Sequence, residues 1–224
     1  MNAALVPVRS ITDAKGRLAR RLDAARREQL ALAMLADMLA ALGAARLVDR
    51  ICVVSSDRLL LASALAQGAE VIEEGEPSGL NAAVAMAGGR LEAGGVKRLL
   101  TIPGDVPLIC PQEVDLLFAS DPSLHPVVVV PSASGTGTNG LLTSPPTVIG
   151  SRFEGASLEA HLGACREAGF EALVVKMDGF ELDVDTPRDL ESLARGGARG
   201  HACLEWLRQW ELYQADGQLR GSPS

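Results

Sequence analysis

Short apolar runs alternate with longer stretches of helical periodicity along most of the chain. Runs rich in Val, Leu, Ile and Ala predict buried strands over residues 3–8, 50–54, 69–72, 98–102, 127–130 and 172–176. Apolar spacing, capping residues and terminal glycines predict helices over 24–42, 57–67, 80–91, 111–120, 157–168 and 187–195. This order predicts an α/β fold in which a mostly parallel sheet lies between two helical layers. Ligands of such sheets bind beyond the carboxyl ends of the strands, so candidate residues are sought in those loops.

The pattern changes after residue 195. The segment "GGARG" resembles a linker, and Trp206, Trp210 and Tyr213 follow it at spacings that place them on one face of a helix over 204–213. We expect this aromatic face to dock on the domain rather than to form a subunit contact, and the last residues to be frayed. The expected organisation is a domain over 1–195, then a linker, a helix and a tail over 196–224.

Composition narrows the class of protein. The 224 residues are 47% hydrophobic and carry a net charge of −7, which suits one domain with a real core and argues against a general nucleic-acid binder. No apolar run approaches the roughly 20 residues of a membrane-spanning helix, and the N-terminus lacks signal-peptide features. We expect a cytoplasmic monomer or homodimer that acts on small molecules. The four cysteines form no C-x-x-C pair and are expected to be buried reduced thiols rather than zinc ligands.

Carboxylates follow two predicted buried segments. In "TIPGDVPLI", Asp105 comes directly after a strand, on a turn stiffened by Pro103 and Pro107, where Gly104 allows a backbone or a ligand to come close. In "FELDVDTPRDL", Asp183 and Asp185 are two residues apart. Residues i and i+2 of an extended chain point to the same side, so this pair is expected to project together at a strand-to-helix corner while Val184 faces the core.

Three such carboxylates suit Mg²⁺, which binds carboxylates together with substrate phosphates. Thr186, Pro187 and Asp189 also have the spacing of a helix start. Each aspartate taken singly is therefore equally compatible with an ordinary turn or cap. The two sites together, in a chain that also has a basic loop, favour a metal.

The basic loop lies in "PVRSITDAKGRLARRL", after the first predicted strand. Arg9, Lys15 and Arg17 concentrate positive charge there, and Lys15 before Gly16 can reach a polyphosphate. The segment lacks the spacing of a Walker A loop. Further arginines along it are also compatible with a solvated helix face.

A third candidate loop is "PSASGTGTNGLL", which follows the strand over 127–130. Its small residues can expose backbone N–H groups to an anion, with Thr138 and Asn139 as polar tips, although such runs also form simple surface loops. Ser157 begins a predicted helix, a natural anion site or a simple cap, and His161 lies one turn later. We group these four residues as candidates for substrate binding.

No Ser/His/Asp or Cys/His arrangement is evident among the three histidines. A substrate phosphate, by contrast, is already ionised at neutral pH and can attack without a protein base. Such a reaction needs positioning and charge neutralisation, which carboxylate-bound Mg²⁺, a basic loop and an anion-binding loop would supply.

Five motifs in order, "VPVRSITDAKGRLA", "PSGLNAAV", "TIPGDVPLI", "GTNGLL" and "LDVDTPRDL", resemble those of the guanylyltransferases of deazaflavin coenzyme (F-420) biosynthesis. That family belongs to the wider nucleotidyltransferases with the fold of molybdopterin-guanylyl and sugar-nucleotide transferases. The resemblance implies a three-layer α/β/α sandwich with a mixed, mostly parallel sheet. It also implies transfer of GMP from GTP to the phosphate of phosphoenolpyruvate, 2-phospho-L-lactate or 3-phosphoglycerate, with release of pyrophosphate.

The resemblance also assigns roles to residues. It makes Asp105, Asp183 and Asp185 the magnesium ligands, places Lys15 at the triphosphate, and places Gly79 and Asn81 at the base and ribose. Arg9 and Arg17 of the same basic loop are expected to bind GTP with Lys15. It places Thr138 and Ser157 at the acceptor acid and matches His161 to a recurrent histidine. Glu154 stands where the family more often has a glycine, and its charge could repel an acid substrate or alter which acid fits.

Three alternatives remain open on the sequence. The same fold and metal site serve cytidylyl or guanylyl transfer to a molybdopterin or sugar phosphate. A D-x-D motif also occurs in glycosyltransferases, although the separate Asp105 argues against that reaction. A non-catalytic nucleotide-binding protein is the remaining class.

Overall fold

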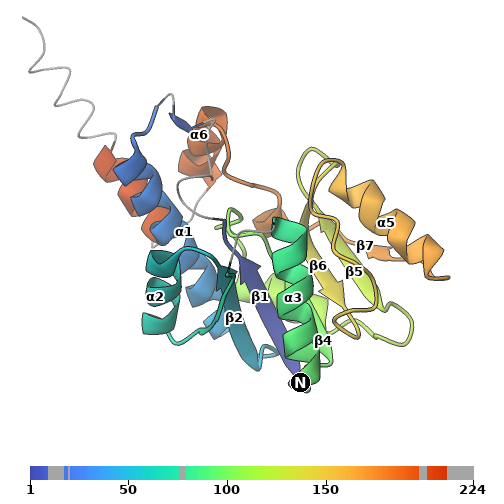
Figure 1. Ribbon diagram of the computed structural model, residues 1–224. Coiled ribbons are helices and arrows are strands. Elements are labelled where there is room, and N and C mark those ends of the chain that lie inside the picture. The colour runs from blue at the N-terminus through green and yellow to red at the C-terminus, as the bar shows by residue number, and fades with distance from the viewer. Residues whose placement is uncertain (10–17, 20, 76–78, 197–200, 211–224) are drawn as a thin grey trace, which may run out of the picture.

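The fold is built on one seven-stranded sheet with the strand order β3-β2-β1-β4-β6-β5-β7 (Figure 1). The computed structural model describes residues 1–9, 18–19, 21–75, 79–196 and 201–210. Lys15, Arg17, Tyr213, most of the expected linker and the expected tail therefore lie outside the described residues. The strands are β1 (Asn2–Pro7), β2 (Arg50–Ser55), β3 (Glu70–Glu73), β4 (Arg98–Thr101), β5 (Val127–Pro131), β6 (Thr138–Thr143) and β7 (Leu173–Val174).

The predicted sheet type is confirmed. Strands β3, β2, β1 and β4 run parallel to one another, and β5 is parallel to β7. Strand β6 is antiparallel to both of its neighbours, β4 and β5. The sheet is therefore mixed and mostly parallel, and β6 joins its two parallel parts.

Helices cover both faces, as predicted for a three-layer sandwich. They are α1 (Ala24–Ala44), α2 (Arg58–Ala66), α3 (Leu80–Ala93), α4 (Pro111–Phe118), α5 (Ser157–Glu167) and α6 (Pro187–Gly196), with a short 3-10 helix η2 (Asp178–Phe180). Alternate residues of β1 face opposite layers: Ala4 and Val6 pack with α1, α2 and α4, whereas Ala3 and Leu5 pack with α3. Helix α5 covers the β5 end of the second face. This period of two is what the continuous apolar runs predicted.

Strand β6 corrects one prediction. The sequence favoured a loop through residue 142, with Thr138 and Asn139 as its polar tips. Both residues instead begin a buried strand and are only 4% and 5% exposed. Gly140 explains the error: a Cβ at this position would lie 3.0 Å from the Phe180 ring, so the glycine serves a close approach within a strand rather than a turn.

The C-terminal segment packs on the body, as expected. Residues 202–210 form a helix, in which the rings of Trp206 and Trp210 stack with centroids 6.1 Å apart. Both rings pack against an apolar cluster that includes Leu30 and Met34 of α1 and Leu193 of α6.

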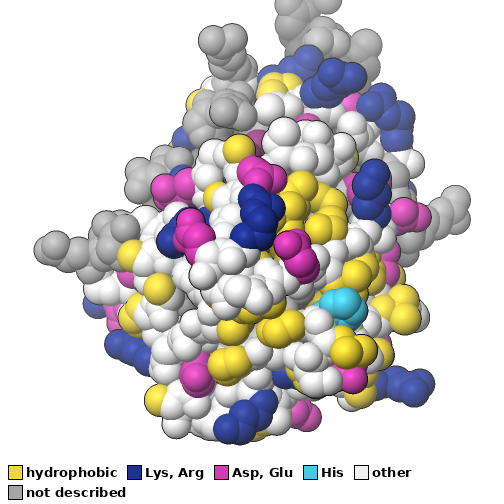
Figure 2. Space-filling model, turned by 90° about the vertical axis from the view of Figure 1, so that its right-hand side faces the viewer, with side chains coloured by type: hydrophobic (Ala, Val, Ile, Leu, Met, Phe, Trp, Pro, Cys, Tyr) yellow, Lys and Arg dark blue, Asp and Glu magenta, His cyan; other side chains and the backbone are white. Residues whose placement is uncertain are grey.

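The described residues bear on the expected state of the cysteines and on whether a helix could span a membrane. All four cysteines are free; Cys52, Cys165 and Cys203 are buried, whereas Cys110 is half-buried. In this part of the chain, the helices are all too short or too polar to span a membrane. The face that carries α5 shows acidic and basic side chains interspersed (Figure 2), in keeping with the modest net charge of −7.

Candidate active site

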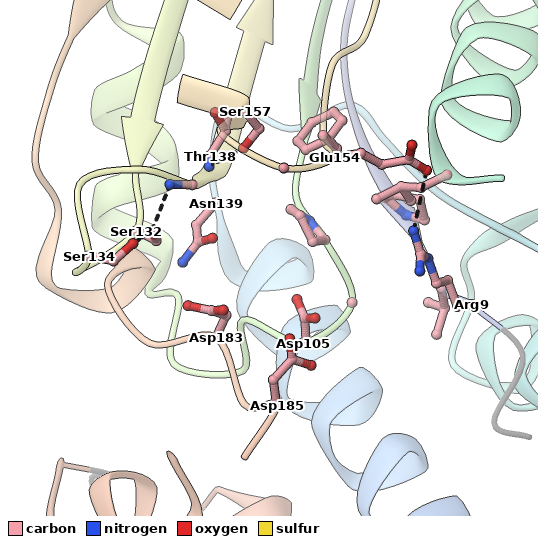
Figure 3. A pocket seen from close by; sticks show the side chains of 18 of the residues that line it. Arg9, Asp105, Ser132, Ser134, Thr138, Asn139, Glu154, Ser157, Asp183 and Asp185 are labelled. Atoms are coloured by element: carbon pink, nitrogen blue, oxygen red, sulfur yellow. Dashed lines mark hydrogen bonds and ion pairs between the residues drawn. The ribbon is translucent and has the colours of Figure 1, made fainter. Parts of the chain in front are cut away.

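A cavity of about 760 Å³ opens at the carboxyl edge of the sheet. Its wall comes from segments that follow β1, β4 and β5, from the start of β6, and from the segments that precede α5 and α6. In Figure 3, three carboxylates lie in the lower part of the cavity, hydroxyl side chains lie on the left, and an Arg–Glu pair lies on the right. The cavity is where a doubly wound sheet places its ligands.

Asp105 reaches this cavity on the turn that follows β4. The Gly104 N–H donates to the carbonyl oxygen of Pro7 at 3.1 Å. A Cβ on Gly104 would lie 2.8 Å from a methyl group of Val8. Gly104 therefore lets the turn after β4 pass close to the chain that leaves β1. The carboxyl ends of these two neighbouring strands lie together as a result.

Asp183 and Asp185 line the same cavity. Val184 between them is fully buried, so the predicted alternation is confirmed, but the segment carries no strand in the structure. The Val184 N–H donates to the carbonyl oxygen of Asp105 at 2.9 Å. This backbone hydrogen bond joins the two acid-bearing segments.

The segment that carries the two aspartates is also held at its ends. Its carboxyl end enters α6 through the predicted capping box: Asp189 Oδ2 accepts from Thr186 N at 2.7 Å and from Asp185 N at 3.0 Å. At its amino end, Asn139 Nδ2 donates to the carbonyl oxygen of Phe180 at 2.7 Å. Asn139 therefore ties the start of β6 to the chain that leads into Asp183.

The hydroxyl side of the cavity is a buried network. Thr138 N donates to Ser157 Oγ at 2.8 Å, and Thr138 Oγ1 lies 3.0 Å from His161 Nδ1. His161 Nε2 accepts from Arg152 N at 2.9 Å, so the neutral ring carries its proton on Nδ1. Burial lowers the pKa of His161 to about 4. His161 is fully buried and lies behind the described residues that line the cavity; it supports Thr138 and the 152–153 backbone.

The opposite side of the cavity carries an ion pair. Arg9, just beyond β1, has its guanidinium 3.5 Å from the Glu154 carboxylate, and both side chains are more than half exposed, at 55% and 58%. Glu154 Oε1 would also be the nearest atom to a Cβ on Gly79, at 3.7 Å. Asn81 Oδ1 accepts from Phe153 N at 2.7 Å, so Asn81 holds the loop that presents Glu154. Leu80 at the start of α3 lines the cavity, whereas its sequence neighbours Gly79 and Asn81 are not among the described lining residues.

The donor set in the cavity suits Mg²⁺. Asp105, Asp183 and Asp185 supply carboxylate oxygens, which are hard ligands. Their carboxylates are not all within 4.8 Å of one another; in the described part of the chain, the group of three that meets this limit is Asp37, His201 and Cys203. Mg²⁺ commonly uses one or two carboxylates and takes its other ligands from phosphates and water, so the open spacing leaves room for substrate oxygens.

Comparison with known proteins decides the family. The family model described as "Guanylyl transferase CofC like" matches residues 2–215. The chain belongs to the CofC-like guanylyl transferase family. Its members are nucleotidyltransferases, and this chain is an enzyme of that class.

Curated relatives of the CofC-like family carry three different acceptor names. The chain is 36% identical to a phosphoenolpyruvate guanylyltransferase of Conexibacter woesei, over 87% of this chain and 91% of the relative. It is 36% identical to a 2-phospho-L-lactate guanylyltransferase of Methanothermobacter thermautotrophicus, over 92% and 89% of the two chains. It is 34% identical to a 3-phospho-D-glycerate guanylyltransferase of Phenylobacterium zucineum, over 88% and 91%.

Solved structures confirm the fold of this CofC-like chain. A nucleotidyl transferase of Methanothermobacter thermautotrophicus superposes with a TM-score of 0.66 at 14% identity, over 93% of this chain and 99% of the other. A Mycobacterium tuberculosis protein solved as a manganese complex superposes with a TM-score of 0.56 at 17% identity, over 88% and 99% of the two chains.

Sequence reasoning on this CofC-like chain missed part of the hydroxyl wall. Ser132, Ser134 and Thr136 line the cavity beside Thr138. Their hydroxyl groups form a chain of hydrogen bonds, in which Ser134 Oγ lies 2.9 Å from both Ser132 Oγ and Thr136 Oγ1. The signal was present as alternate hydroxyl residues in "PSASGTGT", which was interpreted only as a source of backbone N–H groups.

Proposed function

We propose that this enzyme transfers GMP from GTP to the phosphate of a phosphorylated three-carbon acid and releases pyrophosphate. The observation that carries the proposal is the single cavity in which Asp105, Asp183 and Asp185 face a wall of hydroxyl groups. The relatives named for phosphoenolpyruvate, phospholactate and phosphoglycerate support it. We also propose that the enzyme acts in the cytoplasm, as a monomer or a homodimer.

The reaction requires little acid–base chemistry from the protein. An oxygen of the acceptor phosphate forms a bond to the α-phosphorus of GTP while the bond from that phosphorus to the β-phosphate bridging oxygen breaks. The leaving electron pair departs with pyrophosphate, and the attacking oxygen is already ionised. Catalysis then consists of alignment and charge neutralisation, which agrees with the burial of His161 away from the cavity.

In this proposal Asp105, Asp183 and Asp185 would hold Mg²⁺. When bound, the ion neutralises phosphate charge and orients the α-phosphate. The hydrogen bond from Val184 N to Asp105 O keeps the two acid-bearing segments together. The bonds that Asn139 and Asp189 make on either side of the pair fix its ends.

The acceptor acid fits the hydroxyl wall. Ser157 Oγ accepts from the Thr138 N–H, so the hydroxyl hydrogen of Ser157 can point toward an anion. Together with the hydrogen-bonded hydroxyl groups of Ser132, Ser134 and Thr136, this wall offers donors to a carboxylate or phosphate. We place the acceptor here, with His161 as its support.

The nucleotide then occupies the side formed by Arg9, Leu80 and Phe153. Arg9 begins the basic segment that continues to Lys15 and Arg17. We propose that these three side chains bind the triphosphate, and that Gly79 and Asn81 at the start of α3 border the base and ribose.

A nucleotide panel tests this function. The purified enzyme is incubated with GTP, CTP, ATP or UTP, Mg²⁺ and each of the three acids, and released pyrophosphate is measured. We expect acid-dependent pyrophosphate release with GTP. A preference for CTP would favour cytidylyl transfer. In a separate incubation with a nucleotide sugar, release of a nucleoside diphosphate would indicate a glycosyltransferase. Either result would overturn the proposal.

A further inference from the structure

The helix over residues 202–210 lies along α1, at the left of Figure 1. Its buried residues Cys203 and Leu204 join an apolar cluster with Leu30 and Met34 of α1 and with Leu190 and Leu193 of α6. The same cluster contains Val184. The C-terminal helix therefore shares its packing with the residue that separates the two cavity aspartates.

Asp37 of α1 holds the start of this helix. Its Oδ1 accepts from Ala202 N at 2.6 Å and its Oδ2 accepts from Cys203 N at 2.9 Å. These are N–H groups of the first turn, which have no partner within their own helix. The negative charge of a carboxylate at that end also interacts favourably with the positive end of the helix dipole. Asp37 is only 9% exposed. It lies 165 positions before Ala202 in the sequence and supplies the N-terminal cap of the helix.

Asp37, His201 and Cys203 also have the spacing of a metal site. Two observations favour the cap instead. Both carboxylate oxygens already accept backbone N–H groups. Burial, followed by a hydrogen bond to Asp37, raises the pKa of the Cys203 thiol well above its ordinary value, so Cys203 joins the cap as a protonated thiol.

Two connections lead from this cap to the candidate active site. Val184 is fully buried in the cluster, and its N–H is bonded to the carbonyl oxygen of Asp105. Leu18 and Leu22, which follow the basic segment, belong to the same cluster. A shift of the C-terminal helix would loosen the support beneath Val184 and so change where Asp183 and Asp185 point.

We infer that Asp37 is a positioning residue for the cavity carboxylates: it caps the C-terminal helix, which completes the apolar support of Val184. This inference rests on the proposed function for its effect on turnover. Its structural part is independent of turnover, because the cap and the cluster are features of the fold.

The two tryptophans of the chain provide a direct readout, because both Trp206 and Trp210 lie in the C-terminal helix. We expect Asp37→Ala to shift tryptophan emission to longer wavelength as the rings become hydrated. Asp37→Asn keeps one acceptor oxygen and should give an intermediate shift. Gln209→Ala, at an exposed position of the same helix, is the matched control and should behave as the wild type.

The second readout is the metal requirement. Loss of support behind metal ligands commonly costs about 10- to 100-fold in metal affinity or activity. We expect Asp37→Ala to raise the Mg²⁺ concentration for half-maximal rate by about tenfold or more. Binding of Mn²⁺ alone, followed by electron paramagnetic resonance, should weaken by a similar factor, with Asp37→Asn between the two.

The fluorescence, metal-binding and transfer measurements each have an outcome that decides a different point. If Asp37→Ala shifts the emission but leaves Mn²⁺ affinity and the Mg²⁺ requirement unchanged, the helix is a structural attachment only and the inference is wrong. If the emission does not change, Asp37 does not hold the helix and the inference is wrong as well. If the wild type transfers no nucleotide, the proposed function fails, and the Mn²⁺ and fluorescence measurements still decide the positioning role.

Discussion

The backbone N–H of Val184 donates to the backbone carbonyl oxygen of Asp105 at 2.9 Å. This bond joins the turn after β4 to the segment before α6, and each segment brings carboxylates to one cavity. The position of the metal candidates therefore depends on main-chain contacts, which substitutions of the aspartate side chains would leave in place. That property makes these side chains suitable for isosteric tests.

Asp105→Asn and Asp183→Asn should each abolish GMP transfer while the fold is retained. Each change removes one negative charge from the proposed metal site at almost constant volume. Metal-ion charge stabilisation is worth several kcal/mol, so we expect a loss of at least about a hundredfold in kcat. Steady-state rates and thermal melting check the two halves of this prediction. Glu167→Gln, at the exposed end of α5, is the control, and activity near wild type in either aspartate variant would contradict the metal assignment.

Glu154→Gln should improve binding of the acid substrate. Glu154 places a negative charge in a cavity proposed to take two anions, and Arg9 offsets only part of it across 3.5 Å. Because both side chains are more than half exposed, solvent and salt screen the effect. We expect KM to fall by about two- to tenfold at low salt, for the acid and also for GTP on the side that carries Glu154, with smaller changes at high salt.

The matched control for Glu154 is Glu159→Gln, which removes an exposed carboxylate that pairs with Arg166 on α5. Its KM should equal that of the wild type. An unchanged or higher KM in Glu154→Gln would show that this carboxylate does not oppose the acid. Acid titrations at two salt concentrations provide the measurement.

His161 should make stability fall at mildly acidic pH. Its pKa is lowered from 6.5 to about 4, chiefly by burial, so between these values the unfolded chain takes up a proton that the folded chain refuses. This difference in proton uptake has no effect on stability above about pH 6.5. It lowers the free energy of unfolding by up to about 3 kcal/mol by about pH 4. A proton on Nε2 would also oppose the Arg152 N–H that Nε2 accepts.

Urea unfolding between pH 7.5 and pH 4.5 measures this dependence. His161→Gln keeps an acceptor for Arg152 N and a donor for Thr138, but it does not titrate. We expect the variant to show a shallower decline in unfolding free energy than the wild type. Parallel curves for the two proteins would show that His161 does not titrate in this way.

Gly140→Ala should destabilise the fold although it adds only a methyl group. That group would lie 3.0 Å from the Phe180 ring and 3.1 Å from the Val130 Cβ, so the core must shift at a cost of about 1–3 kcal/mol. Gly43→Ala, in α1 with nothing within 4 Å, should instead stabilise by about 0.5–1 kcal/mol. Denaturant unfolding of the pair measures both effects, and equal stabilities would contradict the packing described around β6.

Local patterns predicted the sheet type, most helices and the alternation of Asp183, Val184 and Asp185. These features depend on the spacing of apolar residues and on helix-capping residues, and both patterns are contained within a few neighbouring positions of the sequence. Strand β6 was missed because Gly140, which permits contact with Phe180, has the same sequence signature as a turn glycine. The cap of the C-terminal helix by Asp37 joins residues 165 positions apart, and no local pattern contains it. The Arg9–Glu154 pair likewise depends on how two distant loops meet.

Transfer of GMP to a phosphorylated three-carbon acid can be measured in one competition reaction. Mass spectrometry is applied to a mixture of the enzyme with GTP, Mg²⁺, phosphoenolpyruvate, 2-phospho-L-lactate and 3-phosphoglycerate. We expect a product with the mass of GMP joined through its phosphate to the phosphate of one of these acids, together with pyrophosphate. The relative amounts of the three products would identify the preferred acceptor. Absence of all three products from a folded preparation that binds GTP would contradict GMP transfer to these acids.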